Sequence, residues 1–318
     1  MSTEAPIRRR MLIIVNPYAT TVSDRLKNLV IYALQGRFEV EVEATESQEH
    51  AIRIGRAARS GGYDLVVAFG GDGTVNEVVN GLAGTEIPVA FLPGGNTNVV
   101  CRTLGIPNDV VDATEHLLSL ADDFRPRKID LGMVDDRYFV FSCGAGIDAS
   151  VVRKVDANPK LKASAGPWFY SWKAMSTYAR EYMRNPTRLG VEVDGRTCEG
   201  VTVLAQNSDP FTYFGSRKIH VCPNVRIDDG TLSMVVLERA NQLDALGIVP
   251  RLLSSRLPTE KHSQARLFEG VSEATVRSLP GEGDTDPRPF PVQVDGDFIG
   301  NHSEVTLRAA PKALSIIA

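Results

Sequence analysis

Hydrophobic and polar positions follow two alternating periods over roughly the first 125 residues. The strand-like segments are short apolar or alternating runs: 11–15, 38–42, 65–69 and 87–92. The helical segments have apolar residues three to four positions apart: 24–35, 48–59 and a stretch from about Thr74. Strands that alternate with helices in this order indicate a parallel sheet with helices on both faces. We therefore predict an α/β domain over residues 8–134.

The pattern changes after about residue 128, where short strands separated by Gly, Asp and Pro turns dominate. The strand candidates are 129–134, 138–143, 189–194, 200–205, 231–238, 271–277, 291–294 and 303–308. One helix is expected among them, from about Pro167 to Arg184. Many short strands with frequent turns predict an antiparallel sandwich or barrel over residues 135–318.

Composition and charge exclude several classes of protein. With 43% hydrophobic and 23% charged residues, the chain resembles ordinary globular proteins. The 35 basic and 39 acidic residues argue against a general nucleic-acid binder, which normally carries basic excess. The four cysteines form no CxxC pair, so we expect reduced thiols in a cytosolic protein. We find neither a signal peptide nor a run of about 20 apolar residues, so we expect no transmembrane segment.

A glycine-rich turn follows the strand at 65–69. In Gly70-Gly71-Asp72-Gly73-Thr74, the glycines allow close backbone approach and aim N–H groups at an anion. The following helix adds positive charge at its N-terminus, and the spacing of Thr74 and Glu77 predicts a capping box. Asp72 would repel phosphate unless Mg²⁺ or a reacting hydroxyl lies between them. We predict a phosphate-binding loop; the alternative is a tight turn of the fold.

Two further polar turns follow predicted strands, at Asn16–Thr20 and at Pro93–Asn98. The carboxyl ends of parallel strands share one edge of the sheet, where ligands bind. We therefore expect the three turns to meet in one crevice, the alternative being three unrelated turns.

The residues from Gly70 to Val78 resemble the signature of the diacylglycerol kinase catalytic domain, which sphingosine and ceramide kinases share. Other family motifs have counterparts in the same order: Asn16-Pro17, Pro93–Asn98, Ile129–Gly132, Gly146–Ala149, Ile227–Gly230 and Asp295–Asp297. The resemblance spans nearly the whole chain. It implies an NAD-kinase-like α/β domain followed by an antiparallel β-sandwich domain, with a nucleotide in the cleft between them.

The resemblance also implies which residues hold ATP. Val99 departs from the family pattern, which usually has an acidic residue there. The implied nucleotide-binding residues are Asn16, Pro17, Tyr18, Ala19, Thr20, Thr45, Gly70, Gly71, Asp72, Gly73, Thr74, Asn76, Glu77, Gly95, Asn96 and Thr97.

The turn Asp295-Gly296-Asp297 holds two carboxylates. Two acids so close raise one pKa, which suits a general base, although Asp-Gly is also a common hairpin turn. The resemblance implies that the proton acceptor lies here, with Asp297 where the family usually has Glu. Asp295 and Asp297 both stay candidates for the base, and Asp72 is the third candidate catalytic residue.

The run from Arg226 to Thr231 resembles the family's structural Mg²⁺ loop. The resemblance implies that the Asp229 carboxylate binds the ion together with the backbone carbonyls of Arg226 and Thr231. Mg²⁺ prefers oxygen ligands and keeps water, so one carboxylate suffices. A plain turn is the alternative. Asp148 is expected to line the acceptor side.

Residues 153–188 carry eight basic and two acidic residues and both tryptophans. A basic aromatic helix suits an anionic membrane surface, but equally a surface helix packed on the sandwich. We expect a cytoplasmic, ATP- and Mg²⁺-dependent lipid kinase that acts peripherally at the inner face of the membrane and converts diacylglycerol to phosphatidic acid. The alternatives are a sphingoid-base or other lipid kinase, an NAD kinase and a catalytically silent nucleotide-binding regulator. Whether the protein forms a homodimer stays an open question at this point.

Overall fold

The computed structural model describes residues 8–19, 23–147, 149–150, 187–222, 224–239, 262–281 and 285–318. The chain divides into two compact units: Met1–Ile129 with Lys312–Ala318, and Asp130–Pro311. Two strands run across the division, β5 (Arg127–Val134) and β18 (Glu304–Ile316). Compared with the predicted domains 8–134 and 135–318, residues 312–318 thus return to the first unit.

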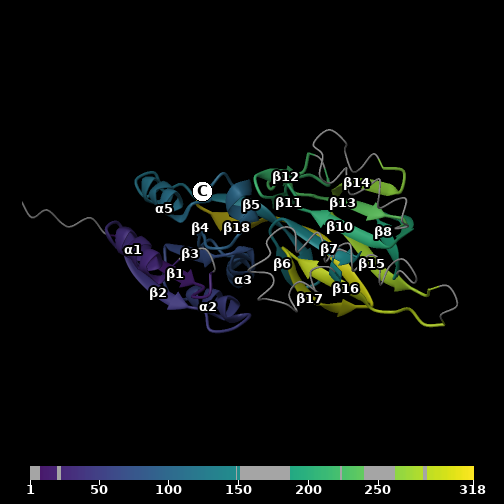
Figure 1. The fold of residues 1–318 in the computed structure, drawn as a ribbon, viewed down its shortest axis with the longest axis horizontal. Coiled ribbons are helices and arrows are strands. Elements are labelled where there is room, and N and C mark those ends of the chain that lie inside the picture. The colour runs from purple at the N-terminus through teal and green to yellow at the C-terminus, as the bar shows by residue number, and fades with distance from the viewer. Residues whose placement is uncertain are drawn as a thin grey trace, which may run out of the picture. The chain divides into compact units, whose positions relative to one another are not determined.

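The first unit is built on parallel strands in the order β2-β1-β3-β4, with the end of β18 beside β4. The strands are β1 (Arg10–Val15), β2 (Glu39–Ala44), β3 (Leu65–Gly70) and β4 (Val89–Pro93). The helices are α1 (Asp24–Gln35), α2 (His50–Ala58), α3 (Asp72–Leu82), α4 (Val99–Thr103) and α5 (Val110–Ser119). Helix α1 packs with α5 on one face and α2 with α3 on the other (Figure 1). The predicted α/β fold is confirmed.

The order of the strands creates a switch point between β1 and β3. The chain leaves β1 for β2 on one side and then returns to β3 on the other. In sheets of this kind, ligands bind outside the carboxyl ends of the strands at the switch point. The fold therefore directs attention to the turns that follow β1 and β3.

Burial explains why these segments form strands and helices. Strands β3 and β4 are buried throughout, as continuous apolar runs between two helical layers require. Strand β2 is the edge strand and is largely exposed, and its alternating glutamates disfavour pairing with another chain. Helices α2 and α3 approach closely at Gly55 and Gly81, which have no side chains. A Cβ on Gly81 would lie 2.8 Å from the Gly55 Cα atom.

The second unit consists mainly of antiparallel strands in two sheets. One sheet has the order β14-β13-β10-β7-β16-β17; the other contains β15, β8 and β9 beside the first part of β18, together with β5 and β6. The strand bounds are β6 (Arg137–Phe139), β7 (Ser142–Gly146), β8 (Arg188–Val193), β9 (Arg196–Gly200), β10 (Thr202–Gln206), β13 (Leu232–Leu237), β14 (Ala265–Val271), β15 (Glu273–Leu279), β16 (Phe290–Val294) and β17 (Asp297–His302). A separate hairpin joins β11 (Thr212–Phe214) to β12 (Arg217–Ile219).

One apolar core holds the two sheets together. It combines residues of both sheets, including Val191 and Val276 from one and Val203, Met234 and Phe290 from the other. This packing confirms the β-sandwich and excludes the barrel that the strand pattern alone left open.

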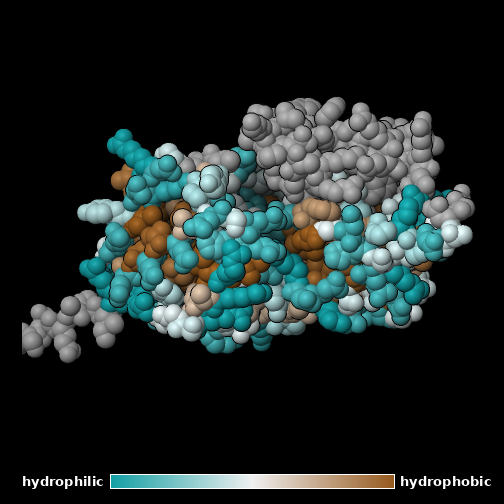
Figure 2. All heavy atoms as spheres, turned by 90° about the horizontal axis from the view of Figure 1, so that it is seen from below, coloured by the Kyte–Doolittle hydropathy of each residue, from teal (hydrophilic) through white to brown (hydrophobic). Residues whose placement is uncertain are grey.

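Several predicted features lie outside the described residues: the helix from Pro167 to Arg184, Thr20 and Asp148. Within the described ranges, no helix has the length and apolar character that crossing a bilayer requires. Seen from below, the described surface is largely hydrophilic, with hydrophobic residues showing in patches between polar ones (Figure 2).

Candidate active site

The three polar turns of the first unit converge, as predicted. The backbone N–H of Asn16 donates to the carbonyl oxygen of Phe69 at 3.0 Å, and its side-chain Nδ2 donates to Thr74 Oγ1 at 3.2 Å. The N–H of Gly94 donates to the Gly70 carbonyl at 2.8 Å. The turns after β1, β3 and β4 therefore form one surface at the carboxyl edge of the sheet.

Glycine is required where the turns after β3 and β4 meet. A Cβ on Gly94 would lie 3.0 Å from the Gly70 Cα atom, and one on Gly95 would lie 2.8 Å from the Gly71 Cα atom. Both contacts are with backbone, which cannot swing aside as a side chain does. The two turns thus depend on the missing side chains for their approach.

Asn98 holds the second glycine turn in shape. Its Oδ1 accepts from the Gly95 N–H at 2.9 Å, and its Nδ2 donates to the Gly95 carbonyl at 2.7 Å and to Asn108 Oδ1 at 2.9 Å. Asn98 is buried with φ +48°, a left-handed conformation that Asn tolerates. Within this turn Asn96 is exposed, whereas Val99, the departure from the family pattern, is 2% exposed and packs in the interior.

Asp72 is the first residue of α3 and links the first glycine turn to α4, the helix that follows the second. Its Oδ1 accepts a hydrogen bond from the backbone N–H of Val100 at 3.2 Å, which fixes the start of α4. Burial, and secondarily the charge of Asp72, raises the pKa of the Cys101 thiol. A neutral thiol therefore lies behind the carboxylate.

The predicted capping box at Thr74 and Glu77 is wrong. Helix α3 begins earlier, at Asp72, with Gly71 as its N-cap and no side-chain cap. Glu77 instead caps the neighbouring helix α2: its two oxygens accept from the backbone N–H groups of Glu49 at 2.8 Å and Ala51 at 3.1 Å. The motif was misread because glycines can begin a helix without a capping side chain, which leaves Glu77 for a tertiary role.

The other implied nucleotide-binding residues differ in their placement. The N–H of Thr45 donates to the Val15 carbonyl at 2.9 Å, which puts the end of β2 beside Asn16. Tyr18 is 79% exposed, whereas Asn76 is fully buried and accepts hydrogen bonds from Asn80 Nδ2. Thr45 therefore lies at the edge of the candidate site, and Asn76 lies in the interior beneath it.

Sequence reasoning missed a cation at this edge. The ammonium of Lys27, on the buried face of α1, donates to the carbonyl oxygen of Pro17 at 2.6 Å. The available signal was a lysine in the row of inward-facing positions otherwise held by Val30 and Leu34.

The second unit contains the predicted carboxylate turn. Asp295 and Gly296 form a two-residue hairpin loop between the paired residues Val294 and Asp297, with φ values of +48° and +85°. Positive φ at both positions is typical of a type I′ turn. Asp297 follows this loop as the first residue of β17, and its side chain is half-buried.

The Asp295 carboxylate is buried and bound to backbone. Its Oδ2 accepts from the N–H of Val140 at 2.7 Å, and its Oδ1 accepts from those of Phe141 at 2.9 Å and Ser142 at 3.1 Å. These bonds anchor the hairpin to the segment between β6 and β7. The geometry thus gives the two aspartates of the turn different environments.

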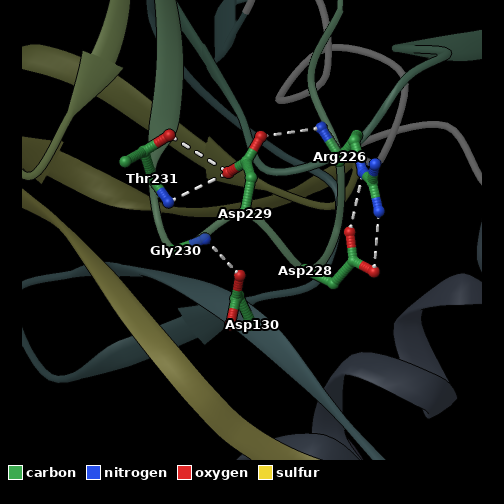
Figure 3. A network of polar contacts seen from close by, with 6 residues as sticks. All are labelled: Asp130, Arg226, Asp228, Asp229, Gly230 and Thr231. Atoms are coloured by element: carbon green, nitrogen blue, oxygen red, sulfur yellow. Dashed lines mark hydrogen bonds and ion pairs between the residues drawn. The ribbon is translucent and has the colours of Figure 1, made fainter.

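The loop that resembles a Mg²⁺ site is closed by Asp229 (Figure 3). Its Oδ1 accepts from both the N–H and the Oγ1 of Thr231 at 3.0 Å, while its Oδ2 accepts from the Arg226 N–H at 3.1 Å. Asp228 pairs with the Arg226 guanidinium, and the buried Asp130 Oδ2 accepts from the Gly230 N–H at 2.6 Å. Figure 3 shows Asp130 reaching the loop from β5.

The donor set of this loop fits a Mg²⁺ ion that keeps several waters. Asp229 Oδ2 accepts a single hydrogen bond within the described part of the chain, so it retains a lone pair for a cation. The described residues contain no group of three His, Cys, Asp or Glu side chains placed to hold a metal. Any ion here therefore depends on one carboxylate together with carbonyls and water.

Asn207 connects the carboxylate turn to the metal-type loop. It is fully buried, and its Nδ2 donates to the carbonyls of Asp130 and Val140, each at 2.9 Å. Asp130 bonds to the loop, and Val140 bonds to Asp295. The two features thus share one hydrogen-bonded scaffold, which no local sequence pattern indicates.

Comparison with known proteins agrees with these features. Residues 10–134 match the family model of the diacylglycerol kinase catalytic domain, and residues 142–318 match that of the YegS C-terminal NAD kinase beta sandwich-like domain. A diacylglycerol kinase of Staphylococcus aureus is 30% identical over 302 residues, covering 92% of this chain and 88% of the relative. One from Staphylococcus carnosus is 28% identical, covering 92% and 90%.

Solved structures show the same fold. A diacylglycerol kinase crystal structure from Bacillus anthracis superposes with a TM-score of 0.69 at 21% identity, covering 98% of this chain and 97% of that one.

Proposed function

The chain belongs to the diacylglycerol kinase family, and from that premise we propose that it is an ATP- and Mg²⁺-dependent lipid kinase that phosphorylates diacylglycerol to phosphatidic acid. The observation that carries the proposal is the convergence of three turns, two of them rich in glycine, at the switch point of the first unit. Backbone N–H groups and the N-terminus of α3 suit the phosphates of a nucleotide.

The first unit would hold the nucleotide. Asn16, Gly70–Gly73 and Gly95–Thr97 offer main-chain and side-chain donors at the sheet edge, with Thr45 beside them. Magnesium bound with the nucleotide neutralises charge on the phosphates that are transferred and released. Asp72, placed among these donors, is the residue that would hold that ion through its oxygens.

The second unit would supply the base. In the proposed reaction Asp297 accepts the proton of the lipid hydroxyl while that oxygen attacks the γ-phosphorus, and the bond to the β-phosphate oxygen breaks to release ADP. Asp295 orients the turn, because its oxygens bind three backbone N–H groups. Asp229, with the carbonyls of Arg226 and Thr231, would hold a second, structural Mg²⁺.

We also propose that the protein works peripherally at a membrane, since its substrate is a lipid. The support is the basic segment 153–188 of the sequence. Each basic residue near an anionic surface contributes about 1 kcal/mol of binding free energy, and salt weakens the attraction. Sedimentation with anionic and neutral vesicles at low and high salt tests this directly.

The experiment that tests the proposed reaction is transfer from γ-labelled ATP. Purified protein and Mg²⁺ are offered diacylglycerol, sphingosine, ceramide and NAD in separate reactions, with Asp297→Asn as the control. Label in phosphatidic acid supports the proposal. If only another acceptor is labelled, that acceptor replaces diacylglycerol as the proposed substrate. Nucleotide binding without transfer to any acceptor identifies a catalytically silent regulator.

A further inference from the structure

We propose that Lys27 provides the cationic contact to the nucleotide phosphates in this chain. The inference rests on the proposed function and deepens it by assigning a phosphate-binding residue outside the glycine turns. Lys27 is only 6% exposed, and its Nζ lies 2.6 Å from the Pro17 carbonyl oxygen.

The charge of this buried ammonium is poorly balanced by the protein. In the described part of the chain its partners are the Pro17 carbonyl and Asp24 Oδ1, the latter at 3.4 Å on a side chain that is 92% exposed. An ammonium has three N–H donors, and a buried charge costs free energy unless it is paired. Among the described residues, two of its three N–H donors have partners, so one donor stays available to an anion.

The position of Lys27 in α1 adds to this cost. The residue lies in the first turns of the helix, where the helix dipole disfavours a cation. A side chain that served only to fill space beneath the turn would be more stable without a charge. The charge is therefore explained better by an anion that binds nearby.

The anchoring contact puts the ammonium at the candidate site. Pro17 follows Asn16, whose Nδ2 donates to Thr74 Oγ1 in the glycine-rich loop. On the other side of the same turn, a Cβ on Gly94 would lie 3.1 Å from the Ala19 Cβ. Lys27 thus contacts the turn that borders both glycine loops.

The converging turns lack a cation of their own. Residues 16–19, 70–77 and 94–98 contain no lysine or arginine, and Asp72 and Glu77 add negative charge. A nucleoside triphosphate brings several negative charges to this place. A lysine contributes a point charge to phosphate binding wherever its ammonium reaches the oxygens.

The test compares the affinities of ATP and adenosine for the wild-type protein and for Lys27→Gln, Lys27→Met and Lys27→Arg, measured by calorimetry. Lys128→Gln is the matched control, since Lys128 is an exposed lysine of the same unit that pairs with Glu86 at 2.6 Å. We expect Lys27→Gln and Lys27→Met to weaken ATP binding about 10- to 100-fold, the loss of one charged hydrogen bond. Adenosine affinity should change less than about 2-fold, because adenosine carries no phosphate.

The outcomes separate this inference from the proposed function. Three outcomes would assign Lys27 to the Pro17 contact alone and so overturn the inference. They are an equal loss of affinity for ATP and adenosine, an unchanged affinity for ATP, and failure of both neutral variants to fold while Lys27→Arg folds. If Lys27→Arg still binds ATP more tightly than adenosine, as the wild-type protein does, the result supports the inference. Binding is measured without a lipid, so a protein that prefers ATP through Lys27 but phosphorylates no acceptor would refute only the proposed reaction.

Discussion

Asp295 and Asp297 are separated by one glycine but differ in their surroundings. Asp295 is 4% exposed and its carboxylate accepts three backbone hydrogen bonds, whereas Asp297 begins β17 with a half-buried side chain. The sequence presents the two as equivalent acids. Because of this difference, the proposed reaction gives the role of base to Asp297 and that of positioning residue to Asp295.

The two substitutions should therefore have different effects. Asp297→Asn should lower kcat by about 10²–10⁴-fold, because it removes the proposed proton acceptor. Asp295→Asn should lower the free energy of unfolding by about 1–3 kcal/mol, because an amide nitrogen would face backbone N–H donors. Steady-state kinetics measures kcat, and urea unfolding measures the free energy of unfolding, for each variant. A stable, inactive Asp295→Asn together with an active Asp297→Asn would reverse the assignment.

Replacing Glu77 should affect α2 rather than α3. Glu77→Ala removes the carboxylate that caps the N-terminus of α2 and should cost about 1 kcal/mol of unfolding free energy. Glu86→Ala is the control, because Glu86 is exposed and pairs only at the surface with Lys128. Hydrogen exchange should be faster at Glu49 and Ala51 in Glu77→Ala; unchanged protection there would contradict the capping role.

Gly95→Ala should weaken ATP binding. The added Cβ would meet the Gly71 Cα atom at 2.8 Å, so the two glycine turns must separate, at a cost of about 1–3 kcal/mol. Gly84→Asn is a suitable control, because Gly84 has open space around it and Asn tolerates its φ of +78°. Calorimetric titration with ATP measures the difference, and equal affinities for the two variants would count against the importance of this contact.

Magnesium should stabilise the second unit through Asp229. Addition of Mg²⁺ should raise the Tm of the wild-type protein, and EDTA should reverse the rise. Asp229→Asn should abolish most of the response, whereas Asp228→Asn should keep it, since Asp228 pairs with the Arg226 side chain. A full response in Asp229→Asn would show that the ion binds elsewhere.

Cys198 should be the thiol that reacts in the folded protein. Cys101, Cys143 and Cys222 are buried, whereas Cys198 is partly exposed. Partial burial raises the pKa of Cys198, so its thiolate fraction at pH 8 is below that of an ordinary cysteine. Reaction with a disulfide reagent should therefore be slow at pH 8 and faster at higher pH, and Cys198→Ser should abolish it. Fast labelling of Cys101 would contradict the burial described here.

Periodicity predicted strands β1–β4 and helices α1–α3 of the first unit, but not α4, α5 or every strand of the second unit. Strands β1, β3 and β4 are apolar runs buried between helices, so their pattern is strong. Strands β9 and β12 are short and largely exposed, so burial leaves little signal in their residues. Strand β18 was predicted only in part, because its exposed middle separates two buried ends.

The candidate site was predictable where backbone geometry decides it. Glycines after buried strands indicate turns, and parallel topology brings such turns together. The roles of Glu77, Lys27 and Asn207 depend on contacts between residues distant in sequence, namely with α2, Pro17 and Asp130. No pattern within a short window of one sequence encodes these contacts.

The return of residues 312–318 to the first unit has a consequence for biosynthesis. Strand β4 has an apolar neighbour, the end of β18, that the ribosome makes only after the second unit. Until then the nascent chain exposes β4 as an unpaired apolar edge, the kind of surface on which chains aggregate. The first unit therefore completes its sheet only after the second unit has been synthesised.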